Sequence, residues 1–114
     1  MQYITLNHQV TFYVPSTNHK DKITNAEFIK RTNEIANTLS ETFGGASIQK
    51  VKGFYKADSG EYITETINKV VSFCTDVQLE DNTDVIINLA SSKCKLYEQE
   101  SIGLEIDNKF YLID

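Results

Sequence analysis

Few side chains in this sequence could do chemistry, and they are widely separated. Glu65 is the best single carboxylate, because it stands among threonine and isoleucine in a β-prone run. An inward-facing Glu65 would have a raised pKa and could act as an acid or a base. Such a glutamate more often faces water or pairs with a lysine, here Lys52 or Lys69. We therefore predict no catalytic residue and no enzymatic activity.

Histidine and cysteine do not supply a second site. His8 and His19 lie in polar sequence, and a metal ion needs three or four converging donors. Cys94 lies between two lysines and has no histidine nearby to activate it. We predict no metal, no cofactor, and two reduced thiols, Cys74 and Cys94, in a cytoplasmic protein.

Acidic side chains dominate the charge, since 16 Asp and Glu oppose 11 Lys and Arg for a net charge of −5. They gather in clusters, which either are solvated helix faces or steer a basic protein partner. The residues predicted to bind a host or defence protein are Glu27, Glu34, Glu41, Glu80, Asp81 and Asp84.

Composition argues against two other kinds of partner. Arg31 is the single arginine, and arginine is the usual reader of bases and phosphates, so sequence-specific DNA binding is not expected. No apolar run approaches the roughly 18 residues that a membrane-spanning helix needs, so a membrane protein is not expected.

The central helix is predicted over Asn25–Phe43. Thr24 and Glu27 have the spacing of a capping box, and apolar residues recur at helical intervals up to Phe43. Gly44 follows, and glycine accepts the left-handed conformation of a C-cap.

The remaining elements are mainly strands. Alternation over 10–14 predicts one strand, and residues 3–6 predict a short extra one. Two β-prone runs, 46–56 and 61–74, are joined by a turn at Asp58-Ser59-Gly60, and a bulge is expected near Gly53. Residues 76–81 are expected to connect to a second helix that starts at Asp81 or Asn82 and runs to about residue 97. Residues 102–106 and 109–113 predict a last pair of strands.

This order, β-α-β-β-α-β, predicts one α+β domain over residues 1–114 with a ferredoxin-like split βαβ fold. Its antiparallel sheet carries both helices on one face, and an extra terminal strand is allowed. The other face is left open. Phe54, Tyr55 and Tyr62 on the hairpin indicate that this open face is partly apolar and predict a homodimer contact.

Several of these residues resemble an uncharacterised domain-of-unknown-function family of small ferredoxin-like α+β proteins from phage and plasmid accessory regions. The resemblance covers about residues 10–106. It rests on Phe43-Gly44, Gly53 with Tyr55, Gly60, Glu65, and Gln99-Glu100-Ser101. It implies the topology and no activity.

Together these observations predict a non-enzymatic, anti-CRISPR-like accessory protein of a mobile element, which inhibits a host or defence protein through its acidic surface. Two alternatives remain open. One is a dimeric α+β barrel that binds or transforms a small ligand near Glu65. The other is single-stranded RNA binding on the open sheet, with Lys50, Lys52 and Lys56 beside the hairpin aromatics.

Overall fold

The computed structural model describes residues 1–114 and has the α+β order that the sequence predicts. Seven strands and two helices are formed. In chain order they are β1 (His8–Pro15), β2 (Thr17–Asn18), β3 (Asp21–Lys22), α1 (Asn25–Phe43), β4 (Ser47–Lys56), β5 (Tyr62–Cys74), α2 (Asp76–Leu96), β6 (Ile102–Ile106) and β7 (Lys109–Ile113).

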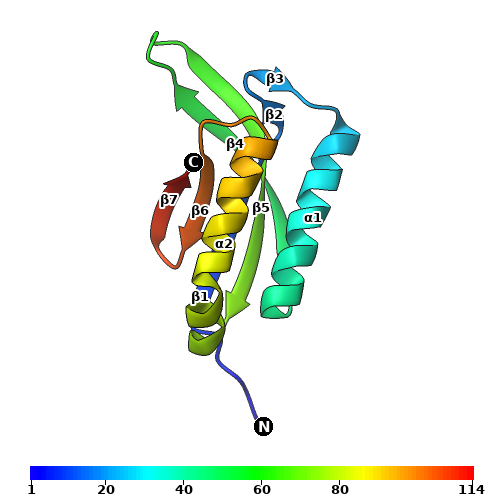
Figure 1. The fold of residues 1–114 in the computed structure, drawn as a ribbon, viewed down its shortest axis with the longest axis vertical. Coiled ribbons are helices and arrows are strands. Elements are labelled where there is room, and N and C mark those ends of the chain that lie inside the picture. The colour runs from blue at the N-terminus through cyan, green and yellow to red at the C-terminus, as the bar shows by residue number, and fades with distance from the viewer.

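The main sheet has five antiparallel strands in the order β4-β5-β1-β6-β7, and β2 and β3 form a small separate sheet. Strand β1 is central and is flanked by β5 and β6, which follow α1 and α2 in the sequence. Figure 1 shows both helices on one side of this sheet. The ferredoxin-like topology is therefore confirmed, and β7 is the extra terminal strand.

The core lies between the helices and one face of β1. Side chains alternate along a strand, so Val10, Phe12 and Val14 point to the helices and are completely buried. They pack in one cluster with Ile35 and Leu39 of α1 and with residues of α2. Thr11 and Tyr13 point to the opposite face, where no helix covers the sheet.

Helix α1 has the predicted limits. The Thr24 side chain accepts a hydrogen bond from the Glu27 amide at 3.1 Å, and Gly44 ends the helix in the left-handed region with φ of 99°. Only this half of the capping box forms, because the Glu27 carboxylate lies 3.6 Å from Arg31 Nε instead of returning to the Thr24 amide.

Helix α2 starts earlier than predicted. Residues 76–81 are helical, and Thr75 is the N-cap: its side chain accepts from the Gln78 amide while the Gln78 side chain accepts from the Thr75 amide. This complete capping box satisfies two amides that would otherwise lack partners. The prediction of an acidic connector was wrong, because acidic residues in the first turn also suit the helix dipole.

Two smaller predictions were also wrong. Residues 3–6 form no strand and lie exposed in the N-terminal segment that projects from one end of the molecule (Figure 1). Strands β4 and β5 pair without a break from Ser47 opposite Val71 to Lys56 opposite Tyr62, so no bulge forms near Gly53. At the predicted turn, Gly60 has positive φ of 88°.

The β4–β5 hairpin extends beyond the rest of the sheet. Pairing between β1 and β5 stops at Pro15 opposite Ile67, so residues 62–66 of β5 pair with β4 alone. Figure 1 shows this two-stranded extension reaching past the ends of both helices. Neither helix combines the length and the apolar content that crossing a membrane requires.

The three hairpin aromatics do not share one face. The pairing register and the alternation of side chains put Phe54 and Tyr62 on the helix side of the ribbon, whereas Tyr55 belongs to the open face. The lysines at 50, 52 and 56 have the same parity as Phe54, and Lys52 Nζ lies 5.5 Å from the centre of the Phe54 ring. The prediction that all three aromatics lie on the open face was therefore wrong for Phe54 and Tyr62, and it holds for Tyr55 alone.

Candidate functional site

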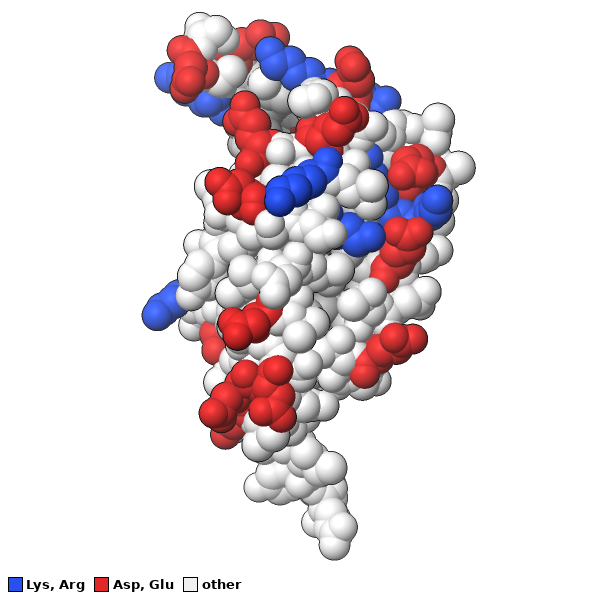
Figure 2. Space-filling view, viewed as in Figure 1, with Lys and Arg blue, Asp and Glu red and all other residues white.

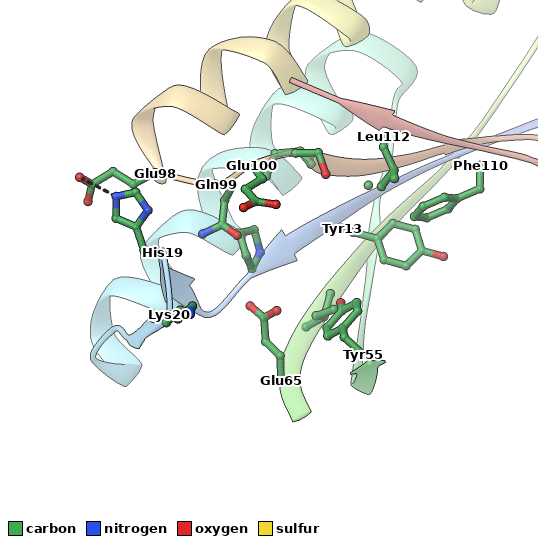
Figure 3. Close-up of a pocket in the computed structure, with 15 residues that line it drawn as sticks. Tyr13, His19, Lys20, Tyr55, Glu65, Glu98, Gln99, Glu100, Phe110 and Leu112 are labelled. Atoms are coloured by element: carbon green, nitrogen blue, oxygen red, sulfur yellow. Dashed lines mark ion pairs between the residues drawn. The ribbon is translucent and has the colours of Figure 1, made fainter. Parts of the chain in front are cut away.

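A cleft with a volume of about 430 Å³ opens on the sheet face that the helices leave free. Its walls come from β1, the β4–β5 hairpin, the loop after α2, and β6 and β7. Figure 3 shows Glu65, Gln99 and Glu100 grouped around the end of β1, with the rings of Tyr13, Tyr55 and Phe110 to one side. The lining residues are Tyr13, Pro15, His19, Lys20, Tyr55, Glu65, Ile67, Glu98, Gln99, Glu100, Ser101, Ile102, Gly103, Phe110 and Leu112.

Tyr13 and Phe110 form the aromatic wall of the cleft. Their rings meet edge to face, with centres 5.1 Å apart and planes at 85°. The Tyr13 hydroxyl donates a hydrogen bond of 2.8 Å to Glu105 Oε1. Burial, together with this bond, raises the pKa of Tyr13 to about 12, so the phenol stays neutral at physiological pH.

Tyr55 folds back along its own strand toward Glu65. A Cβ on Gly53 would lie 3.0 Å from the Tyr55 hydroxyl and 3.1 Å from Ile67 Cδ1, so a glycine at 53 leaves the space that the tyrosine occupies. Burial raises the pKa of Tyr55, and the charge of Glu65 raises it further. A neutral phenol and a carboxylate thus lie beside each other on the extended hairpin.

Glu65 is held by the segment that follows β1. Its Oε1 accepts hydrogen bonds from the Ser16 amide and the Thr17 hydroxyl, both at 3.1 Å. The expected lysine pairing is absent: Glu65 lies opposite Gly53 in the ladder and forms no ion pair with Lys52 or Lys69. The carboxylate is half-buried and faces the cleft.

Gln99 is tied to the same segment from the other side of the cleft. Its Nε2 donates to the Thr17 carbonyl at 2.7 Å and to the Tyr97 carbonyl at 3.0 Å. Glu100 follows on the loop before β6 and brings a second, exposed carboxylate to the cleft.

His19 and Lys20 form part of the rim. The His19 amide donates to the Glu98 carbonyl at 2.9 Å, and its Nε2 lies 3.7 Å from Glu98 Oε1 (Figure 3). Both residues have positive φ, 52° at His19 and 53° at Glu98. This contact joins the two loops that border the cleft.

The arrangement suits a flat ligand that carries positive charge. Aromatic faces attract weakly hydrated cations, and the carboxylates of Glu65 and Glu100 add negative charge to the same space. The rings of Tyr13 and Phe110 also offer surfaces on which a heterocycle can stack. Three groups with fixed hydrogen bonds (Glu65, Gln99 and the Tyr13 hydroxyl) can orient such a ligand.

The acidic residues predicted to bind a protein lie elsewhere, on the helices. Glu27 is close to Arg31, and Glu34 Oε2 lies 3.6 Å from Lys93 Nζ. Glu41 has no ion-pair partner, while Glu80, Asp81 and Asp84 are exposed on α2. Figure 2 shows separated acidic groups on this face, with basic side chains between them in its upper half. Their binding of a protein stays a prediction.

Sequence reasoning weighed Glu65 alone and Tyr55 with the other hairpin aromatics, and it missed Tyr13, Phe110 and Gln99 as parts of one site. One signal was available. Tyr55, Glu65 and the Gln99-Glu100-Ser101 run, quoted above for the family resemblance, all line this cleft, and Gly53 underlies Tyr55. The cleft brings together residues as far apart in the sequence as Tyr13 and Leu112.

Comparison with known proteins gives a fold relationship. No family model and no curated protein matches the chain. Among solved structures, a phage SAM lyase in complex with S-methyl-5'-thioadenosine matches with a TM-score of 0.70 and 21% identity over 99% of this chain and 93% of that chain. A phage SAM lyase in the apo state matches with a TM-score of 0.69 and 19% identity over 99% and 94%.

This likeness contradicts the prediction of a non-enzymatic inhibitor. Both similar structures are of an enzyme, and one of them holds a small nucleoside. From the sequence, Glu65 was expected to face water or to pair with a lysine, whereas it faces a cleft that other parts of the chain complete. The comparisons back the alternative of a dimeric α+β barrel that binds or transforms a small ligand better than they back the inhibitor.

Proposed function

We propose that this protein is a lyase that cleaves S-adenosylmethionine, or a closely similar sulfonium nucleoside, in the open-face cleft. The observation that carries the proposal is the convergence of Tyr55, Glu65, Gln99 and Glu100 beside the Tyr13–Phe110 wall. The phage SAM lyase structures support it, because they share the fold over nearly the full length of both chains.

The chemistry of the ligand fits the side chains. S-adenosylmethionine combines a heterocycle, which an aromatic wall can hold, with a sulfonium cation, which aromatic faces and carboxylates attract. S-methyl-5'-thioadenosine remains when the bond between sulfur and Cγ of the methionine part breaks. The carboxylate of the methionine part of the same molecule attacks Cγ as this bond breaks, so a new C–O bond closes a lactone. The electron pair of the broken bond goes to sulfur and cancels its positive charge.

The proposed role of the protein is to position the sulfonium and to limit its contact with water. Glu65 is fixed by two donors and can face the cation without moving. Preorganised groups of this kind act without reorganisation during the reaction. Orientation of the two reacting parts of one substrate is the other large contribution available here.

The test is incubation of the purified chain with S-adenosylmethionine and chromatography of the nucleoside product. We expect S-methyl-5'-thioadenosine to form well above the rate without protein. Glu65→Gln keeps the shape of the side chain and removes its charge, and we expect about a 100-fold loss of kcat, in line with removal of one electrostatic group. Glu41→Gln, on the exposed surface of α1, is the matched control and should leave kcat unchanged.

A rate equal to that of the protein-free solution would refute the proposal. If Glu65→Gln and Glu41→Gln lowered kcat equally, the result would show that the reaction does not take place in this cleft. The alternative of RNA binding on the open sheet face is not supported, because the three hairpin lysines lie on the helix side of the ribbon, together with Phe54 and Tyr62.

Three further parts of the hypothesis from the sequence remain proposals: the origin on a mobile element, the cytoplasmic location and the self-association. An origin on a mobile element is consistent with the phage source of both similar structures. Cytoplasmic action is consistent with Cys74 and Cys94, which are free, buried thiols as the sequence predicts. Self-association is supported by exposed apolar side chains on the open face, among them Tyr55, Phe110 and Leu112.

A further inference from the structure

Arg31, the single arginine of the chain, is almost fully buried, with 2% of its surface exposed. It lies on α1 below the small β2–β3 sheet. A charged side chain is rarely buried unless hydrogen bonds or opposite charges offset the loss of its hydration. The partners of Arg31 therefore show which part of the fold this side chain holds in place.

The guanidinium group is held by one short segment and one ring, and the Glu27 carboxylate lies 3.6 Å from its Nε. Nη1 donates to the Pro15 carbonyl at 3.1 Å and to the Thr17 carbonyl at 2.9 Å, and Nη2 donates to the Asn18 side chain. The plane of the group lies over the Tyr97 ring, with Cζ 4.2 Å from the ring centre. The rigid fork of arginine thus fixes three acceptors within four consecutive residues.

The same segment orients two groups of the cleft. Between Pro15 and Asn18 lie the Ser16 amide and the Thr17 hydroxyl, the two donors to the Glu65 carboxylate. The Thr17 carbonyl, which accepts from Arg31, also accepts from Gln99 Nε2. Arg31 itself is not part of the cleft lining. The hydrogen bonds that link Arg31 to Glu65 pass through this segment. Gln99 is reached in addition through Tyr97, whose ring Arg31 covers and whose carbonyl accepts from Gln99 Nε2.

We propose that Arg31 is a positioning residue of the cleft: by holding residues 15–18, it sets the orientation of the Glu65 carboxylate and the Gln99 amide. The reactivity of the cleft depends in this way on a side chain buried behind it. The inference rests on the function proposed above for the cleft, and part of its test does not need activity.

The kinetic test is a double-mutant cycle. Arg31→Lys keeps the positive charge and loses the branched guanidinium group, so residues 15–18 should shift. Displacements of about 1 Å can lower a reaction rate on the order of 100-fold. We expect kcat to fall about 30-fold while KM changes less than about threefold. In the Glu65→Gln background the same substitution should cost less than about threefold, because the carboxylate that it orients is already gone.

The matched control is Thr32→Val, the neighbouring buried position of α1, whose hydroxyl bonds to Asn68 and not to the segment. Its effect on kcat should be within about twofold in both backgrounds. If Arg31→Lys and Glu65→Gln were additive, as independent effects are, the positioning role would be refuted.

Amide hydrogen exchange separates this inference from the proposed activity. In Arg31→Lys the Ser16 amide should exchange at least about tenfold faster, while core amides such as that of Phe12 keep their protection relative to global unfolding. An unchanged Ser16 amide would overturn the inference even in an active protein. If the wild-type chain cleaves nothing, the proposed function fails and this exchange result alone decides the positioning.

Asn18→Ala serves if Arg31→Lys does not fold, because it keeps the guanidinium and removes one acceptor. It should accelerate Ser16 exchange about threefold and lower kcat in the same direction, again with little effect in the Glu65→Gln background. If the Ser16 exchange rate and the kcat of Asn18→Ala equalled those of the wild type, this would count against the inference.

Discussion

The ring of Phe110 lies against the backbone of Gly103 on the open face of the sheet. A Cβ at position 103 would come to 2.7 Å from Phe110 Cζ and 3.3 Å from Tyr13 Cβ. Gly103 therefore permits the edge-to-face pair of Tyr13 and Phe110 that forms one wall of the cleft.

We expect Gly103→Ala to force Phe110 out of this position and to lower the free energy of unfolding by about 1–3 kcal/mol, as overpacking does. Urea denaturation measures the change. The control is Gly45→Ala, where a Cβ meets nothing within 4 Å, and its effect should be within about 0.5 kcal/mol. Equal effects at the two positions would show that Phe110 does not occupy the space above Gly103.

A buried hydrogen bond joins the helix to the sheet. Asn68 Nδ2 of β5 donates to Thr32 Oγ1 of α1 at 3.0 Å, and both residues are more than nine-tenths buried. Thr32→Val leaves the amide without this acceptor, so we expect a loss of about 1–3 kcal/mol in the free energy of unfolding. Adding Asn68→Leu should recover part of that loss in thermal or urea denaturation. A double variant less stable than Thr32→Val would contradict this explanation.

The His8 ring bridges two carboxylates at the end of the molecule where the N-terminal segment begins. Its Nδ1 lies 2.9 Å from Asp107 Oδ2 and its Nε2 lies 2.5 Å from Asp76 Oδ1. The hydrogen bond with Asp107 and that with Asp76 raise the pKa of His8, and the bonds from His8 and the Gln9 amide lower the pKa of Asp107. The folded protein therefore binds the His8 proton more tightly than the unfolded chain does.

From these directions we expect a stability maximum in mildly acidic solution. The His8 contribution is complete below its unfolded pKa of about 6.5 and is lost as the pH rises through the raised folded value. The Asp107 contribution is present above its unfolded pKa of about 4 and is lost as the pH falls through the lowered folded value. Urea midpoints across this range should fall above pH 6.5 in the wild type and stay level in His8→Gln. Identical profiles would exclude His8 as the group responsible.

Three of the six tyrosines have a raised pKa, and Tyr13 and Tyr97 should be the last to titrate. Burial, the largest cause at both positions, raises the pKa of Tyr13 and of Tyr97 to about 12. Unfolded tyrosine titrates near pH 10, so the unfolded chain loses these protons first and stability should fall between about pH 10 and 12. Phenolate absorbance measures the late fraction, which Tyr13→Phe should reduce by one group. Tyr97→Phe should likewise reduce that late fraction by one group.

Local signals in the sequence predicted the elements, and the structure shows why they were sufficient in some places. Thr24 and Gly44 limit α1 through bonds to their own neighbours, so both ends could be found from short spacings. The Thr75–Gln78 spacing carried the same information for α2, but the acidic run after it was interpreted as a connector.

The site could not be found in this way, because its parts depend on strand register. Tyr13, Glu65 and Gln99 come together only after β5 pairs with β1 and the loop after α2 returns to the end of β1. Phe54 and Tyr55 are adjacent in the sequence and still belong to opposite faces. The buried environment of Arg31 was equally invisible, since nothing near it in the sequence shows that residues 15–18 fold over it.

The two-stranded end of the β4–β5 hairpin carries one side of the cleft beyond the five-stranded part of the sheet. Tyr55 and Glu65 belong to this ribbon, whereas Gln99, Glu100 and Phe110 belong to the body of the molecule. A ribbon without flanking strands twists more readily than a wide sheet. The bonds from Ser16 and Thr17 to Glu65 therefore tie this ribbon to the segment after β1 and keep the two sides of the cleft at a defined distance.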